Sequence, residues 1–138
     1  MKTRFSALVQ LKKDTMQKSE RALERTNADI NSATMALELS YTSLQDIQTP
    51  TTGTISDFLA SRELQNSARN LIVKNHEWIK FAKEQQHIAR EKLKADTIEY
   101  EKFNYLEVEE IKKLVKEREQ VLAKELDEIA LMTYKKKF

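Results

Sequence analysis

The chain has 138 residues, of which 33% are charged and 40% hydrophobic, with 24 basic and 22 acidic side chains. This length suggests one domain, and this composition is typical of long helices and coiled coils. Charges of both signs alternate along the chain, whereas nucleic-acid-binding domains concentrate basic residues, so no nucleic-acid partner is expected. The absence of cysteine excludes disulfide and thiolate chemistry. No apolar run approaches the roughly 20 residues that span a bilayer, and residues 1–5 lack a signal-peptide core, so a cytoplasmic protein is expected.

A sevenfold apolar repeat predicts a first helix over residues 3–48. The repeat consists of Val9, Met16, Leu23, Ile30, Leu37 and Leu44. The second heptad position is small or polar except at its ends, Phe5 and Ile47. A helix with so narrow an apolar stripe is only marginally stable in water by itself. We therefore expect this helix to pack against a second helix that offers large residues opposite its small ones.

One segment interrupts the helical pattern. Pro50 and Gly53 are the only proline and the only glycine of the chain, and both residue types disfavour a helix interior. We expect a turn over residues 49–55 and a second helix over 56–136. Thr54 can cap this helix with Asp57 three residues later, and Ser56 is a competing cap.

The second helix has a sevenfold series of its own, which shifts phase between Tyr100 and Val108. Placing Ile47 opposite Phe58 brings Leu37 against Ala68 and Ser19 against Gln86. In this register large residues face small ones repeatedly. The N-terminal end of the first helix then lies near Tyr100, and residues 101–136 extend beyond it as an overhang.

The predicted fold class is therefore all-α. We expect residues 1–138 to form a single coiled-coil domain, a long antiparallel two-helix hairpin with an overhanging C-terminal helix. The apolar stripe of the overhang has no partner in its own chain, which is typical of a binding element.

Patterns for catalysis, cofactor binding and metal binding are missing from the sequence. His76 and His87 stand eleven residues apart, roughly 16 Å along a helix, too far to share one metal, and we interpret both as solvated. A two-helix hairpin offers no cleft to perturb carboxylates such as Glu107 and Glu110. The sequence therefore predicts no enzyme and no catalytic, cofactor or metal site. Trp78 either covers the edge of the core or anchors a partner.

Two segments carry a family resemblance. Lys124-Glu125-Leu126-Asp127-Glu128-Ile129-Ala130 resembles the closing motif of the FliJ family, the general cytoplasmic component of flagellar type III export. Phe5-Ser6-Ala7-Leu8-Val9-Gln10-Leu11-Lys12 resembles the opening of that family. The injectisome counterparts, the YscO-like stalk proteins, are similar to the chain as well.

The resemblance implies a non-enzymatic stalk, like the coiled coil of the γ subunit of rotary ATPases. It implies three partners: the hexameric export ATPase, the export gate protein FlhA, and export chaperones. By position, the ATPase-facing end comprises Val115, Leu122, Leu126, Asp127, Glu128, Ile129 and Ala130. The gate-facing surface is expected near the hairpin tip, at Tyr41, Leu44, Ile47, Phe58, Leu59 and Arg62. The protein would be at most peripheral to the membrane-embedded export apparatus.

Two alternative functions use the same apolar overhang. A coiled-coil holdase chaperone would bind its clients there. A scaffold protein would form a homodimer through residues 101–136.

Overall fold

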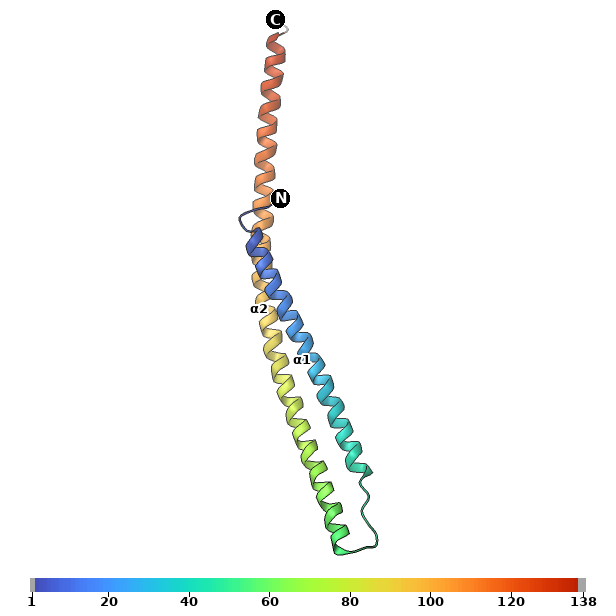
Figure 1. Cartoon of the computed structure of the whole chain (residues 1–138). Helices are drawn as coiled ribbons and strands as arrows, with labels where there is room; N and C mark the ends of the chain where they lie inside the picture. Colours follow the sequence, from blue (N-terminus) through green and yellow to red (C-terminus); the bar gives the residue numbers. More distant parts are fainter. Residues whose placement is uncertain (1, 137–138) are drawn as a thin grey trace. The chain divides into compact units, whose positions relative to one another are not determined.

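The computed structural model describes residues 2–136, and it shows two long helices packed against each other with no strand in that range. Helix α1 (Ser6–Asp46) and helix α2 (Ile55–Lys136) run antiparallel and are joined by the link of residues 47–54 (Figure 1). The predicted all-α fold of two packed helices is confirmed. The chain divides into two compact units, described separately below. We call Gln17–Lys94 the hairpin unit, and Met1–Met16 with Ala95–Phe138 the terminal unit.

Helix α1 starts with a side-chain cap at Thr3. The Thr3 hydroxyl accepts a hydrogen bond from the backbone N–H of Phe5 at 3.1 Å, and the Ser6 hydroxyl accepts one from the N–H of Thr3 at 2.8 Å. This reciprocal pair satisfies N–H groups that the first helical turn leaves without partners. It explains why the chain enters α1 directly after Thr3.

Helix α2 starts with the capping box that the sequence predicts. Thr54 Oγ1 accepts a hydrogen bond from the N–H of Asp57 at 3.3 Å, and Asp57 Oδ2 accepts one from the N–H of Thr54 at 3.1 Å. Thr54 is therefore the cap, and the competing assignment to Ser56 is wrong. Gly53 precedes the cap with a φ of +148°, a backbone conformation that L side chains rarely adopt.

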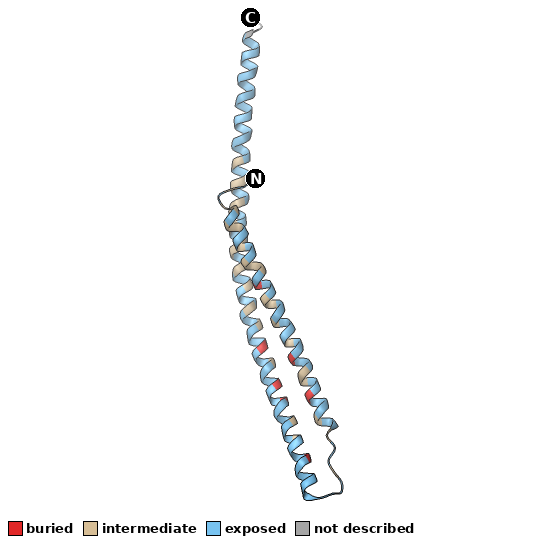
Figure 2. Cartoon of the chain, in the orientation of Figure 1, coloured by how far each residue is buried: buried red, intermediate tan, exposed pale blue. Residues whose placement is uncertain are grey.

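Small and polar residues form the centre of the hairpin unit (Figure 2). Ala33 is 0% exposed and Ala82 is 3% exposed, and the buried positions also include Ser19, Ser40 and Asn75. Ile72 is the one large residue among the buried positions of this unit, and the other large residues of the repeat, such as Leu37, are half-buried. Small residues let two helices approach closely, while the larger side chains pack along the edges of the contact.

The helix register of the hairpin unit differs by one heptad from the predicted one, which was wrong. The prediction placed Leu37 against Ala68. Asn75 lies there instead, since its Nδ2 donates to the Ala36 carbonyl at 3.2 Å and to the hydroxyl of Ser40, the residues on either side of Leu37. The buried Asn75 is satisfied by α1 only in this register.

A second polar contact agrees with the shifted register. Gln86 was predicted to face Ser19, but its Nε2 donates to Asn27 Oδ1 at 2.6 Å. The cause lies in the link, which was predicted to be a turn over residues 49–55. Its extended residues lie along the start of α2, where Ser61 Oγ donates to the Gln48 carbonyl at 3.3 Å. The link, rather than the last turn of α1, therefore contacts α2 at Ser61 and Gln65.

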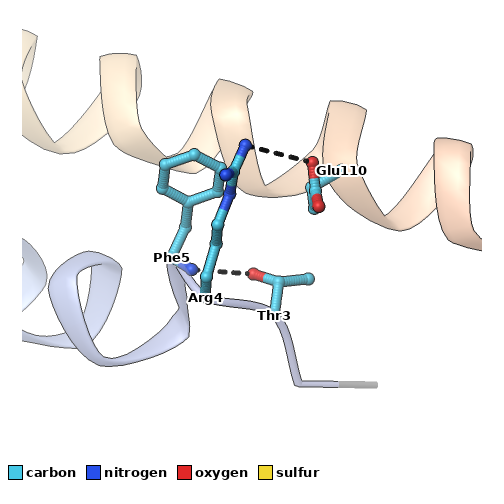
Figure 3. A network of polar contacts seen from close by, with 4 residues as sticks. All are labelled: Thr3, Arg4, Phe5 and Glu110. Atoms are coloured by element: carbon cyan, nitrogen blue, oxygen red, sulfur yellow. Dashed lines mark hydrogen bonds and ion pairs between the residues drawn. The ribbon is translucent and has the colours of Figure 1, made fainter.

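The terminal unit shows the same shift. Phe5 was expected opposite Tyr100, but Arg4 forms an ion pair with Glu110 at 3.8 Å and Ser6 Oγ donates to Glu107 Oε1 at 3.1 Å. Figure 3 shows the Arg4 side chain, which also lies over the Phe5 ring at 4.9 Å, reaching across to Glu110.

Helix α1 therefore covers α2 farther toward its C-terminus than predicted. The half-buried positions of α2 continue through Phe103, Glu107, Glu110 and Leu114, with no phase shift after Tyr100. Every residue from 115 to 135 is exposed. The expected overhang of 101–136 was wrong at its start, because residues 101–114 are partly covered. We call residues 115–135 the free end of α2.

Replacing Gly53 by alanine should destabilise the start of α2. A Cβ at this position would lie 2.8 Å from Asp57 Oδ2, the atom that caps the helix, and the backbone φ would be strained as well. We expect Gly53→Ala to lower the free energy of unfolding by about 1–2 kcal/mol. Urea titration followed by circular dichroism measures this. Thr52→Ala, an exposed change in the same link, is the control and should shift stability by less than about 0.5 kcal/mol. Equal stability of the two variants would contradict the capping geometry.

Engineered disulfides can test the register, because the chain has no cysteine of its own. In the observed register Ala33 faces Ile79, whereas in the predicted one it would face Ile72. The Ala33→Cys/Ile79→Cys variant should therefore oxidise to an intramolecular disulfide, and the Ala33→Cys/Ile72→Cys variant should not. Thiol titration after mild oxidation distinguishes them, and the reverse result would restore the original register.

Candidate interaction surfaces

The free end of α2 carries an apolar stripe that no other described residue covers. Three of its members repeat at intervals of seven: Val115, Leu122 and Ile129. Seven residues are just under two turns of an α-helix, so these side chains lie on one face with a slow drift, and Leu126 falls on the same face. Exposure along the stripe runs from 39% at Val115 to 66% at Leu126.

The other residues that the family resemblance assigns to the ATPase-facing end are also exposed, but they lie on other faces of the helix. Asp127 and Glu128 follow Leu126 by one and two residues, so they point away from the stripe, and Ala130 lies beside it. The structure therefore brings together Val115, Leu122, Leu126 and Ile129 as an apolar face. It leaves Asp127 and Glu128 on its flanks as a source of negative charge.

The predicted tip residues of the hairpin unit fall into two groups. Tyr41, Phe58, Leu59 and Arg62 are exposed. Leu44 and Ile47 are half-buried, as expected for members of the α1 heptad repeat that face α2. A partner at the tip would therefore meet the exposed group, while Leu44 and Ile47 support the surface from beneath.

Tyr41 is held by a residue that sequence reasoning treated as solvated. Its hydroxyl lies 2.9 Å from His76 Nε2, and the two rings meet edge to face with centroids 6.2 Å apart. His76 follows the buried Asn75 directly in α2, so the pair borders the polar contact that sets the register. The correct register would have revealed this pair, because it brings the turn of α1 that holds Tyr41 next to the turn that holds His76.

A hollow at the tip includes residues that sequence reasoning missed. It has a volume of about 320 Å³ and is lined by Thr49, Phe58, Ser61, Arg62, Gln65 and Arg69. Only Phe58 and Arg62 were predicted. The other four come together because the link folds back along α2, a path that no local sequence pattern indicates.

Within residues 2–136, no group of histidine, cysteine and acidic side chains could hold a metal ion. No described helix is both long and apolar enough to cross a membrane. The surfaces that the structure does present are exposed stripes and a shallow hollow, which are suited to contacts with other proteins.

A helical hairpin with unpartnered apolar surfaces defines a coiled-coil interaction protein. Comparison with protein-family models identifies the flagellar FliJ protein family over residues 1–137, and the chain belongs to this family. FliJ proteins are coiled-coil components associated with flagellar export and are structural rather than enzymatic members of that apparatus. Searches of curated proteins and of solved structures returned no match.

Hydrogen exchange should separate the free end from the covered part of α2. An isolated helix is marginal in water, so amides in residues 117–135 lack the protection that packing against α1 provides. We expect these amides to exchange at least ten times faster than those of residues 61–110. Mass spectrometry of peptic peptides measures the difference. Uniform protection along α2 would mean that another element, such as a second copy of the chain, covers the free end.

Proposed function

We propose that this protein is a non-enzymatic stalk of the flagellar type III export apparatus and binds the hexameric export ATPase through the free end of α2. The observation that carries the proposal is the exposed stripe of Val115, Leu122, Leu126 and Ile129 in a member of the FliJ family. A helix with such a stripe gains stability when a groove of another protein covers it.

The hairpin tip is the second contact surface of the proposal. Tyr41, Phe58, Leu59 and Arg62 are exposed at the end of the hairpin unit and would face the export gate protein FlhA. A stalk of this kind works in the cytoplasm, peripheral to the membrane-embedded gate. The same tip and the exposed α2 surface would also receive export chaperones.

The free end also supports the alternative of a homodimer, but over a shorter segment than predicted. Residues 101–114 are partly covered by the start of α1, so a dimer would have to form through residues 115–135. Sedimentation equilibrium of the isolated protein distinguishes a monomer, as the stalk proposal expects before assembly, from a stable dimer.

A double substitution in the stripe tests the ATPase contact. Leu122→Ser with Ile129→Ser should leave the helices folded, because both residues are exposed and contact nothing in α1. It should weaken binding to the purified export ATPase by about 2–4 kcal/mol, as expected for the loss of two buried aliphatic anchors. Isothermal titration calorimetry measures the change.

The matched control is Leu131→Ser. Leu131 belongs to the same free end and is 60% exposed, but it lies on the opposite side of the helix from Leu122 and Ile129. We expect its affinity to stay within twofold of the native protein. Native-like affinity of the helical double variant would remove the free end from the proposed ATPase contact.

A further inference from the structure

The hollow at the tip combines an aromatic surface with two positive charges. Arg62 and Arg69 are the only charged residues of its lining, and Phe58 is the only aromatic one. No acidic side chain lines it, and within residues 2–136 neither guanidinium has an ion-pair partner. The hollow therefore offers two guanidinium groups, each with several N–H donors free for a ligand, beside the aromatic ring of Phe58.

The neutral polar groups of the lining are already engaged. Ser61 Oγ donates to the Gln48 carbonyl at 3.3 Å, and Gln65 Nε2 donates to Thr49 Oγ1 at 3.2 Å. These two contacts hold the link against α2 and so form one wall of the hollow. The charged donors that are left for a ligand belong to the two arginines.

The spacing of the arginines defines the geometry of a ligand. Arg62 and Arg69 are seven residues apart on one face of α2, about 10.5 Å along the axis. A peptide in the extended polyproline II conformation advances about 3.1 Å per residue with three residues per turn, so acidic side chains three residues apart lie on one face and span about 9 Å, a similar length. Guanidinium groups bind carboxylates in pairs of parallel hydrogen bonds, which gives such a contact direction as well as strength.

The charge around the hollow favours a peptide over an anionic membrane surface. Asp46, Asp57 and Glu63 are near Arg62 and Arg69 in the sequence, so this stretch of chain carries no basic excess. Binding to an anionic lipid surface depends on a concentrated cluster of basic residues. Two directed hydrogen-bonded pairs between arginine and carboxylate do not require such a cluster.

We propose that this hollow binds an extended acidic segment of a partner protein. Two carboxylates three residues apart pair with Arg62 and Arg69, and an apolar side chain beyond the carboxylate at Arg62 packs on Phe58, which lies one helical turn before Arg62. The inference deepens the partner role that the proposed function gives to the tip, since it defines the chemistry of the segment received there. The hollow itself does not depend on which component of the export apparatus supplies that segment.

Fluorescence anisotropy with the full chain tests the proposal. The probe is a fluorescein-labelled peptide with two glutamates three residues apart and a leucine two residues outside each of them, and its control has glutamine in place of both glutamates. We expect saturable binding of the acidic peptide only. Arg62→Gln, Arg69→Gln and Phe58→Ala should each weaken it at least fivefold, while Arg90→Gln, an exposed arginine elsewhere on α2, should change it by less than twofold.

Three results would overturn the inference. The first is absence of binding, and the second is an equal loss with Arg90→Gln, which would indicate unspecific charge attraction. The third is Arg62-dependent binding to phosphatidylglycerol vesicles without peptide binding, which would assign the hollow to lipid. Titration of the export ATPase with Arg62→Gln separates this inference from the proposed function. If the Arg62→Gln variant binds the ATPase with native affinity and the native chain does not bind the peptide, this inference is wrong but the proposed function stands.

Discussion

The length difference between the two helices determines where this protein can be bound. Helix α1 has 41 residues and α2 has 82, so α1 can cover only about half of α2. The link contacts α2 at Ser61 and Gln65, and α1 covers the following part as far as Leu114. What remains is a single helix whose apolar stripe was not removed from water by folding. In a chain with so few buried residues, such a stripe is a large share of the apolar surface available to a partner.

The buried asparagine gives the hairpin unit its specificity rather than its strength. Asn75 satisfies its amide only when the Ala36 carbonyl and the Ser40 hydroxyl lie opposite, and a buried amide without partners would be costly. Because the small residues of both helices also repeat every seven positions, apolar packing alone barely distinguishes registers one heptad apart. The same asparagine places His76 beside Tyr41, so the register also decides which side chains form the surface next to the tip.

This degeneracy explains which features the sequence could predict. The helix-forming segments, the heptad faces and the Thr54 cap follow from local patterns, and the structure confirms them. The register could not be deduced in the same way, since Leu44 and Leu23 meet small residues in either alignment. In the predicted register they face Ser61 and Ala82; moved by one heptad, Leu44 aligns with Ala68 and Leu23 with Ala89. The extended path of the link, which decides between the two, has no periodic pattern. Both the wrong start of the overhang and the missed hollow at the tip follow from that one error.

The two candidate surfaces have different physical character, and this difference favours two kinds of partner. The stripe of Val115, Leu122 and Ile129 is a continuous apolar face with acidic residues on its flanks, so a groove of complementary shape can bury it. The tip hollow instead offers two arginines with Phe58 at one end, where short-range pairing with carboxylates supplies direction and the ring supplies apolar contact. A protein with one apolar surface and one directed, charged surface can hold two partners without competition between them. The proposed stalk function would use this difference, because a stalk would have to remain bound to one component while it meets another.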